Sequence, residues 1–471
     1  MKLSFNWLSE FIEFTETDHN VIKEVITANS AEVETMENTG ELLQHIVLAE
    51  IVKLEPHPEA DKLQLATVNE GSGSIRVVCG GSNLKVGMKI AFAKVGTVVK
   101  LGGQEFLELK PIKIRGVEST GMICASTEIG LEEKFPLKQE KEVLDLSHLS
   151  APLGTTLDRA LGMNDTVIDI DNHAITNRSD LFSQLGFARE LVSNGLAQWK
   201  KSRKQFEIPK ENAEPPIQVH INEPELCPRY SAIYLTGIEV KESSDTIKER
   251  LSACGIRPIN NIVDVTNYVM LELGMPLHAF DFDQLAGKKW EIRRSKKGET
   301  VVTLDQKKHQ LPSDVIVIDD GQDLVDLCGI MGGYQSGINN KTNKIWLHAP
   351  IFNKQLVRQA GRTLNHTSDA STRYEKGVDA ELTTKGLARA VELILESCPG
   401  AKVASKEVDI VSIPTEQRVL SLRQARLDHL IGVTIPKAKI VSTLENLGFG
   451  ITENKEDLMS KFPVIACKTS I

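Results

Sequence analysis

The sequence predicts a multidomain α+β protein, and three observations support that prediction. The chain has 471 residues, and since domains commonly hold about 100 to 200 residues, a single core is not expected. Short β-branched runs interrupted by glycine follow one another from His45 to Arg115, as in a small β-barrel. From about Ile217 onward, strand patterns are mixed with a long helical pattern, which indicates an α+β or α/β domain.

The composition excludes several classes of protein. Acidic residues outnumber basic ones, 64 to 55, and 41% hydrophobic residues are too many for a disordered chain. No apolar run approaches the about 20 residues of a membrane helix, and Glu10 and Glu13 lie where a secretory signal would be uncharged. We therefore expect a cytoplasmic protein. The seven cysteines show no CxxC or Cys/His ligand spacing, so they indicate reduced thiols and neither a disulfide framework nor a zinc site.

The N-terminal segment Met1–Phe14 has apolar residues at helical spacing. Trp7, Leu8, Phe11 and Ile12 follow an i, i+1, i+4, i+5 pattern, which predicts an amphipathic helix that buries one face. Its packing partner is expected to be distant in the sequence. The strands expected next are His45–Leu54, Leu63–Val68, Ile75–Cys79, Lys89–Ala93, Thr97–Lys100 and Leu107–Arg115.

The remaining pattern alternates between strands and helices. Val167–Asp171 is expected to be a strand, and a polar turn then caps a helix whose apolar stripe runs from Phe182 to Val192. A further domain extends from near Ile217 to about Ile413. Its expected elements are strands at Val301–Leu304, Val315–Ile318 and Ile345–Leu347 and a helix at Asp379–Cys398, followed beyond Pro414 by two short helices, Leu422–Leu430 and Lys437–Leu447.

Basic residues gather in the barrel segment although the whole chain is acidic. Between Lys85 and Arg115 there are seven Lys or Arg residues, and only Glu105 and Glu108 oppose them. Such a cluster can bind phosphates, but it is more often a solvated surface.

Three strings in the barrel segment help to decide whether the basic cluster binds phosphates or is only a solvated surface. They are HPEADKL at His57–Leu63, VCGGSN at Val78–Asn83 and RGVESTGMIC at Arg115–Cys124. Together they resemble the oligonucleotide-binding-fold (OB-fold) tRNA-binding domain of several synthetases and free-standing tRNA-binding proteins. The resemblance favours a tRNA-binding surface over a merely solvated one. Phosphate contacts are expected from Lys62, Lys110, Lys113 and Arg115.

A second set of strings resembles the bacterial phenylalanyl-tRNA synthetase β subunit. It consists of IRPINNIVDVTNYV at Ile256–Val269, LGMPLHAFD at Leu273–Asp281, GIMGG at Gly329–Gly333 and DASTRYEKGVD at Asp369–Asp379. The resemblance runs from Met1 to about Gly450. It implies a discontinuous N-terminal α+β domain at 1–39 plus 151–200, an inserted OB-fold barrel at 40–150, an α/β editing domain of B3/B4 type at 217–400, and an incomplete helical and winged module of B5 type at 414–471.

The resemblance also implies hydrolytic editing of tyrosine wrongly attached to tRNA(Phe). A pocket shaped for phenylalanine rejects an analogue that only adds a hydroxyl by about a hundredfold, so a second site has to remove the error. The family pattern assigns catalysis to Thr266, Asn267 and His278, and shaping of the amino-acid pocket to Gly332, Ser368 and Ala370. Taken alone, His278 would more often be a hydrogen-bonded structural histidine. Asn260, Asn261 and Asp264 are interpreted as structural.

One position departs from the family pattern. Where a glutamate usually recognises the tyrosine hydroxyl, this chain has His348, which is expected to bind substrate in its place. A neutral imidazole accepts a phenolic hydrogen bond, but it lacks a permanent negative charge and can become a cation. Asp369 and Glu375 are the nearest acids in the sequence, and the pattern does not say whether either reaches the pocket.

The resemblance implies partners as well. Family members assemble with an α subunit as α2β2, act on tRNA(Phe), and use ATP and Mg²⁺ in the whole ligase, while no residue of this chain is assigned to ATP or to a metal. They also continue beyond the point that corresponds to Ile471, so the chain is expected to be the N-terminal part of such a subunit. Two alternatives remain: a non-catalytic tRNA-binding scaffold with a decayed editing site, and a free-standing hydrolase that edits in trans.

Overall fold

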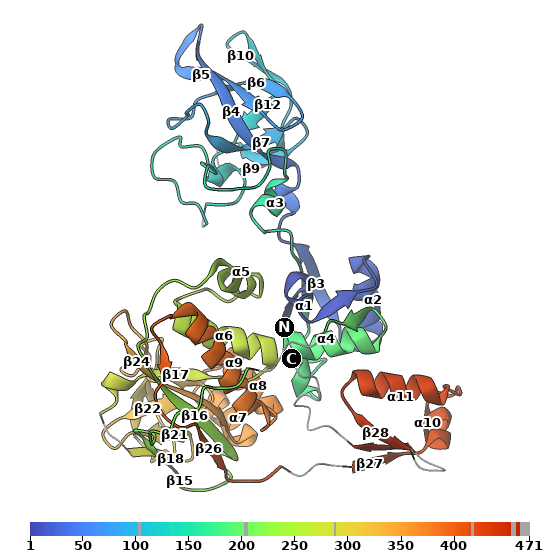
Figure 1. Cartoon of the computed structure of the whole chain (residues 1–471), viewed down its shortest axis with the longest axis vertical. Helices are drawn as coiled ribbons and strands as arrows, with labels where there is room; N and C mark the ends of the chain where they lie inside the picture. Colours follow the sequence, from blue (N-terminus) through green and yellow to red (C-terminus); the bar gives the residue numbers. More distant parts are fainter. Residues whose placement is uncertain are drawn as a thin grey trace. The chain divides into compact units, whose positions relative to one another are not determined.

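The computed structural model describes residues 1–101, 105–132, 134–201, 206–286, 289–415, 419–453 and 458–461. The chain divides into two compact units (Figure 1). One unit joins Met1–Met36 to Val167–Ile471, and the other is the intervening segment Glu37–Thr166. The second unit is therefore an insertion in the sequence of the first.

The inserted unit contains a five-stranded antiparallel sheet with the order β12-β7-β4-β5-β6. Its two edge strands, β12 and β6, contact each other, so the sheet is a nearly closed barrel. The unit comprises η1 Glu41–Leu43, β4 Ile46–His57, β5 Ala60–Asn69, β6 Ser74–Cys79, β7 Lys89–Lys94, β8 Val98–Leu101, β9 Glu105–Glu108, β10 Ile112–Ile114, β11 Val117–Ser119, β12 Gly121–Ile123, η2 Ser126–Glu128 and α3 Leu157–Ala160. The strands predicted in this segment are confirmed, with Leu107–Arg115 divided between β9 and β10.

The inserted unit has two apolar cores, and alternate side chains of β4 contribute to each of them. Ile46 and Leu48 are buried in one apolar cluster, whereas Val47, Ala49 and Ile51 are buried in another. Successive side chains of a strand point to opposite faces, so β4 is covered on both sides.

The predicted N-terminal helix is wrong for most of its length. The segment forms β1 (Lys2–Ser4), the four-residue helix α1 (Phe5–Leu8) and β2 (Ile12–Phe14). Trp7 and Leu8 are fully buried, so the apolar pattern was real, but β-sheet pairing satisfies the backbone on either side of α1.

The N-terminal segment 1–14 packs with a segment distant in the sequence, residues 166–199. Strand β1 pairs with β13 (Thr166–Ile170), and β2 pairs with β14 (Ala197–Trp199). Helix α4 (Gln184–Ser193) lies between β13 and β14 in the sequence, and the side chain of Ser183 accepts a hydrogen bond from the N–H of Gly186 as its N-cap. The other elements here are α2 His19–Asn29, β3 Val33–Asn38 and η3 Ser179–Leu181.

The segment from Gln218 to Val411 contains two five-stranded sheets. One has the order β17-β24-β16-β25, with β26 also pairing with β16, and the other has the order β15-β18-β21-β22-β23. The strands are β15 Gln218–Ile221, β16 Arg229–Thr236, β17 His278–Asp281, β18 Lys289–Arg294, β19 Thr300–Val302, β20 Lys308–Gln310, β21 Ile316–Asp319, β22 Leu324–Leu327, β23 Met331–Gly332, β24 Lys344–Ile351, β25 Lys402–Val403 and β26 Val408–Val411. The helices are α5 Asp245–Ala253, α6 Asn261–Leu273, η4 Phe282–Gln284, α7 Lys354–Thr363, α8 Asp369–Lys376 and α9 Leu382–Ser397.

Helices α6 and α9 pack against each other, and α9 also packs on β24 and β16 (Figure 1). The apolar stripe of α9 explains this contact, because Leu387, Val391 and Ile394 recur at helical spacing and are completely buried. The opposite side of the strands carries a second core around Trp290 and Trp346. The strand β24 is therefore buried on both faces, which places its side chains deep inside this part of the chain.

The last described elements form a small module. They are β27 Val419–Leu422, α10 Gln424–Ile431, α11 Lys437–Asn446, β28 Gly450–Glu453 and β29 Leu458–Lys461. The two predicted helices are confirmed, and Gly432 ends α10 in the left-handed conformation at φ 83°. Residues 416–418, 454–457 and 462–471 of the module expected at 414–471 lie outside the described residues. None of the described helices combines the length and the apolar character needed to cross a membrane. The described cysteines are free thiols, as predicted.

Candidate functional site

A cavity of about 580 Å³ lies within the larger unit. Seven residues that the sequence singled out line it together, although they are as much as a hundred positions apart in the chain. They are Thr266 and Asn267 of α6, His278 of β17, Gly332 of β23, His348 of β24, and Ser368 and Ala370 at the start of α8. The volume falls in the range of pockets that hold small organic ligands, about 300 to 1,000 Å³.

Helix α6 is fixed at both ends, which sets the positions of Thr266 and Asn267. The side chain of Asn260 accepts hydrogen bonds from the N–H groups of Ile262 and Val263, and Gly274 ends the helix at φ 82°. Thr266 Oγ1 donates to the carbonyl of Val263 at 2.7 Å. Its hydroxyl is therefore engaged with the helix, and it can offer a ligand only the acceptor side of the oxygen.

The string that precedes these residues is structural, as interpreted from the sequence. Asp264 accepts hydrogen bonds from Ser243 Oγ at 2.6 Å and from the N–H of Ile259 at 2.7 Å. Asn261 Nδ2 donates to the carbonyl of Glu239 at 3.0 Å. These contacts join the start of α6 to the preceding loops.

His278 and His348 are direct cross-strand neighbours in the antiparallel pair β17 and β24. Their ring centroids are 6.2 Å apart. The pKa of His278 is lowered from 6.5 to about 4 by burial, so its imidazole is neutral at physiological pH. Nε2 of His278 is buried and has no hydrogen-bond partner among the described residues. A polar ligand or a water inside the cavity would supply that missing partner.

His348 is enclosed by aromatic rings. Tyr230, Phe280 and Trp290 contact it edge to face at centroid distances of 5.5, 4.9 and 6.5 Å. The side chain is almost completely buried, and burial together with the nearby His278 lowers its pKa well below 6.5. The folded chain therefore favours the neutral form of this imidazole at physiological pH. Its Nδ1 is buried and lacks a partner in the described structure, so it remains available to a ligand group.

Gly332 leaves the space that His278 occupies. A Cβ atom at this position would lie 2.3 Å from His278 Nε2 and 2.6 Å from Cε1, so no side chain fits without moving the ring. The residue belongs to the short strand β23, which pairs with β22 so that Gly332 is opposite Asp326. Its requirement for glycine is steric.

Asp326 is a cavity residue that the sequence analysis missed. Burial raises the pKa of its carboxyl from 3.8 to about 8, so this acid is largely protonated at neutral pH. A neutral carboxyl can donate a hydrogen bond as well as accept one. Of the two acids named from the sequence, Asp369 lines the cavity and Glu375 does not.

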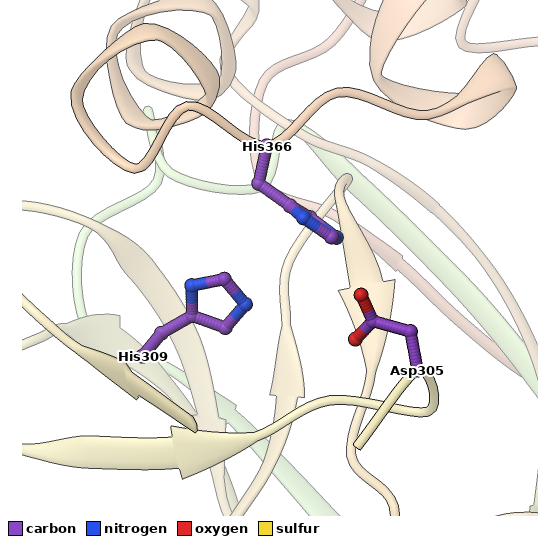
Figure 2. Close-up of side chains that lie close together, drawn as sticks. All are labelled: Asp305, His309 and His366. Atoms are coloured by element: carbon purple, nitrogen blue, oxygen red, sulfur yellow. The ribbon is translucent and has the colours of Figure 1, made fainter. Parts of the chain in front are cut away.

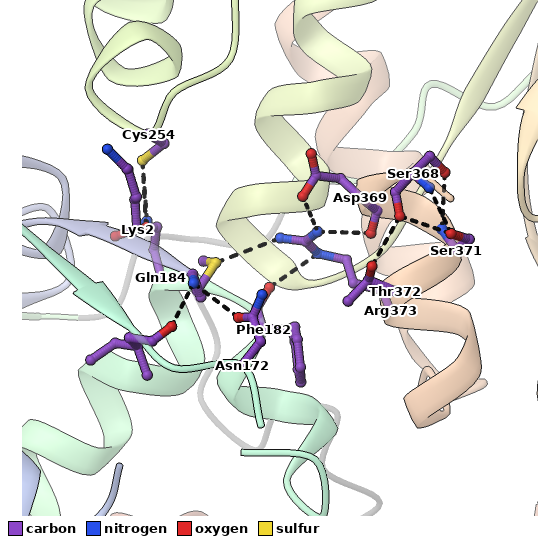
Figure 3. A network of polar contacts seen from close by, with 12 residues as sticks. Lys2, Asn172, Phe182, Gln184, Cys254, Ser368, Asp369, Ser371, Thr372 and Arg373 are labelled. Atoms are coloured by element: carbon purple, nitrogen blue, oxygen red, sulfur yellow. Dashed lines mark hydrogen bonds and ion pairs between the residues drawn. The ribbon is translucent and has the colours of Figure 1, made fainter. Parts of the chain in front are cut away.

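Helix α8 closes the cavity and begins at a capping box. Ser368 Oγ accepts from the N–H of Ser371 at 3.1 Å and donates to the carbonyl of Ile330 at 2.7 Å, so the hydroxyl is engaged in holding the helix. Arg373 anchors the same helix, because its buried guanidinium donates to the carbonyl of Phe182 at 3.1 Å (Figure 3). A contact to the N-terminal part of the larger unit thus fixes one wall of the cavity.

Several basic residues of the inserted unit are engaged within it. Lys89 donates to the carbonyl of Leu149, Lys94 pairs with Glu70, and Lys100 pairs with Glu132. The four residues predicted to contact phosphate are all exposed. They are Lys62 on β5, Lys110 before β10, Lys113 on β10, and Arg115 in the β10–β11 turn.

Three of these four lie near the turn between β4 and β5. Arg115 donates to the carbonyl of Glu59 at 3.5 Å, and His57 Nε2 contacts the carbonyl of Ile114 at 3.2 Å. The β10–β11 hairpin is therefore held beside that turn, with Lys62 three residues farther along β5. This edge of the barrel therefore exposes three basic side chains, beside the exposed acids Glu59, Asp61 and Glu118.

Two family models match parts of the chain. A model of the B3/4 domain matches residues 226–399, and a model of the putative tRNA binding domain matches residues 46–155. The chain is 36% identical over 98% of its length to the phenylalanine–tRNA ligase beta subunit of Gloeobacter violaceus and 35% identical over 100% to that of Geobacter metallireducens. It spans 57% of the length of each of these relatives.

A solved N-terminal fragment of the phenylalanyl-tRNA synthetase beta subunit from Pyrococcus horikoshii is a more distant match. It covers 65% of this chain and 83% of its own length at 14% identity, with a TM-score of 0.32. That TM-score is too low to support a conclusion.

Proposed function

Because the chain is homologous over 98% of its length to the beta subunits of phenylalanine–tRNA ligases, we propose that it serves in phenylalanyl-tRNA aminoacylation as such a subunit. Its contribution is tRNA binding by an OB-fold barrel and hydrolytic editing of tyrosine attached to tRNA(Phe). The observation that carries the editing proposal is the cavity of about 580 Å³ at His278, inside the segment matched by the B3/4 domain.

The chemistry of the cavity suits positioning of water more than strong base catalysis. An imidazole whose pKa is about 4 is a weak base at neutral pH, so it removes protons poorly. Its buried, unpartnered Nε2 can nevertheless hold an attacking water by a hydrogen bond. Asn267, on the adjacent helix α6, offers an amide to the same water or to the ester carbonyl.

Selectivity for tyrosine requires a partner for the phenolic hydroxyl. His348 Nδ1 is a buried acceptor or donor without a partner in the described chain, and the neutral Asp326 carboxyl, which is hydrogen-bonded to the Cys328 side chain, is a second buried polar group of the cavity. A phenol that satisfies either of them gains a hydrogen bond that phenylalanine cannot make. We assign tyrosine recognition to His348, with Gly332 and Ala370 providing space.

The match to the putative tRNA binding domain and four exposed basic side chains of the inserted unit support tRNA binding. Lys62, Lys113 and Arg115 lie beside the β4–β5 turn, and Lys110 precedes the same hairpin. Electrostatic contacts of this kind are strongly salt-dependent. The α subunit and an α2β2 assembly, with ATP and Mg²⁺ serving amino-acid activation, complete the ligase in this proposal. A cytoplasmic location and a B5-type identity for the module after Pro414 belong to the same proposal.

Deacylation of tyrosyl-tRNA(Phe) tests the function. The chain is assayed alone and together with an α subunit, and wild type is compared with His278→Ala. The proposal predicts hydrolysis that the variant loses by about a hundredfold while its tRNA affinity is unchanged. Equal rates for the two proteins would refute editing at this cavity. Salt-sensitive tRNA binding without any hydrolysis would instead identify a non-catalytic scaffold.

A further inference from the structure

Three potential metal ligands meet outside the cavity. Asp305 lies in the turn between β19 and β20, His309 lies on β20, and His366 lies in the loop between α7 and α8. One potential ligand atom from each residue lies within 4.8 Å of the other two. Figure 2 shows the three side chains directed toward a common space.

The two imidazoles lack the hydrogen bonds that buried histidines usually make. Nε2 of His309 and Nε2 of His366 are both inaccessible to solvent and have no partner among the described residues. The residue His366 is only 8% exposed, so bulk solvent does not reach its ring nitrogen Nε2. The rings approach at a centroid distance of 4.9 Å and an angle of 62°, which is not a parallel stack. Two buried ring nitrogens that no described residue satisfies are available to a ligand.

The third member of the cluster is a carboxylate, a ligand that attracts a cation. Thr303 Oγ1 donates a hydrogen bond to Asp305 Oδ1 at 2.6 Å, which helps to orient this carboxylate. Lys307 Nζ now lies 3.0 Å from Asp305 Oδ2, but its side chain is 66% exposed and can turn away into solvent.

We propose that Asp305, His309 and His366 form a binding site for a divalent transition metal, with Zn²⁺ as the expected ion. Two imidazole nitrogens and one carboxylate oxygen are a common zinc ligand set, and the fourth tetrahedral position is open to water. Zinc bonds of about 2.0 to 2.2 Å place tetrahedral ligand atoms about 3.3 to 3.6 Å apart. Because the present ligand atoms lie within 4.8 Å of one another, the side chains have to close by at most about 1.5 Å.

The site ties together two segments that reach the editing cavity. Asp305 follows Leu304, which lines the cavity and donates its N–H to the carbonyl of Gly332 at 3.0 Å. His366 is two residues before Ser368, the N-cap of α8. A bound metal would brace the β19–β20 turn against the α7–α8 loop, and with it two walls of the cavity. This role is structural and does not depend on what the cavity binds.

Zinc binding by the purified full chain tests the proposal. After treatment with a chelator, the chain is titrated with ZnCl₂ by calorimetry, and thermal unfolding is followed with and without the metal. We expect one Zn²⁺ per chain at this site and a higher Tm with zinc. Co²⁺ in place of zinc should give the intense visible absorption of a tetrahedral site.

Variants assign the ion to these residues. Asp305→Asn, which keeps the size of the side chain, and His366→Ala should each weaken zinc binding more than about tenfold. The matched control is His429→Ala, which removes an exposed histidine on α10 and should leave affinity unchanged. If His366→Ala does not fold, Asp305→Asn alone decides. Absence of zinc binding by wild type, or equal affinity in wild type and Asp305→Asn, would overturn the proposal.

Discussion

Replacing Gly332 with alanine is expected to abolish editing while preserving the fold. The new Cβ would lie 2.3 Å from His278 Nε2, whereas an ordinary contact begins at 3.4 Å. The imidazole has to retreat by about 1 Å, and a misplacement of about 1 Å costs a catalytic site about a hundredfold in rate. Crowding of this kind destabilises a core by about 1 to 3 kcal/mol.

The assay is single-turnover deacylation of tyrosyl-tRNA(Phe), with thermal unfolding measured on the same samples. Gly73→Ala is the control, because a Cβ there meets no atom within 4 Å. The double variant Gly332→Ala with His278→Ala tests whether the clash with the imidazole causes the loss of stability. Once the ring is removed, Gly332→Ala should cost almost no stability. A folded Gly332→Ala protein that edits at the wild-type rate would refute the placement of His278 at the reacting ester.

The remaining predictions concern pH and salt. His278 binds fewer protons when folded than when unfolded between pH 6.5 and about 4, so its contribution to stability falls as the pH drops through that window, by up to about 3 kcal/mol. His278→Gln should be less acid-sensitive in thermal unfolding, and wild-type deacylation should show no inflection near pH 6.5. Asp326 behaves oppositely: its folded pKa is about 8 against 3.8, so stability falls as the pH rises from about 4 to 8. Asp326→Asn should therefore raise the Tm at pH 7.5 but not at pH 4. An equal change in Tm at both pH values would contradict a raised pKa and indicate that the Asp326 carboxyl is ionised at both. Lys113→Ala and Arg115→Ala should each reduce the slope of log affinity for tRNA against log salt by about 0.7 to 0.9, whereas Lys439→Ala on α11 should not. Unchanged slopes would exclude Lys113 and Arg115 from the binding surface.

Local pattern predicted much of the secondary structure. The β-branched runs between His45 and Arg115 became strands because glycine turns separate them and alternating side chains are buried. The same reasoning failed at Met1–Phe14. There Trp7 and Ile12 are both fully buried, but pairing with β13 and β14, which are distant in the sequence, competes with helix formation. A pattern read from neighbouring residues cannot predict pairing with strands more than 150 residues away.

The cavity could be predicted only in part. Resemblance named Thr266, His278 and other lining residues, but nothing local indicated Asp326. A single aspartate in a strand has no distinctive pattern, and its raised pKa arises from burial by the whole fold. The metal ligands were missed for a related reason, because His309 and His366 are far apart in the sequence and form no spaced motif. Clusters assembled by tertiary structure are visible only in the fold.

The central claim is that the cavity at His278 holds the ester of a wrongly charged tRNA end. A crystal structure with a non-hydrolysable amide of tyrosine and adenosine tests it most directly. We expect the tyrosyl ring in the cavity, its hydroxyl within hydrogen-bond distance of His348 or Asp326, and the amide carbonyl near His278. An analogue bound elsewhere, or a cavity filled by the chain's own side chains, would show that the cavity does not hold the ester.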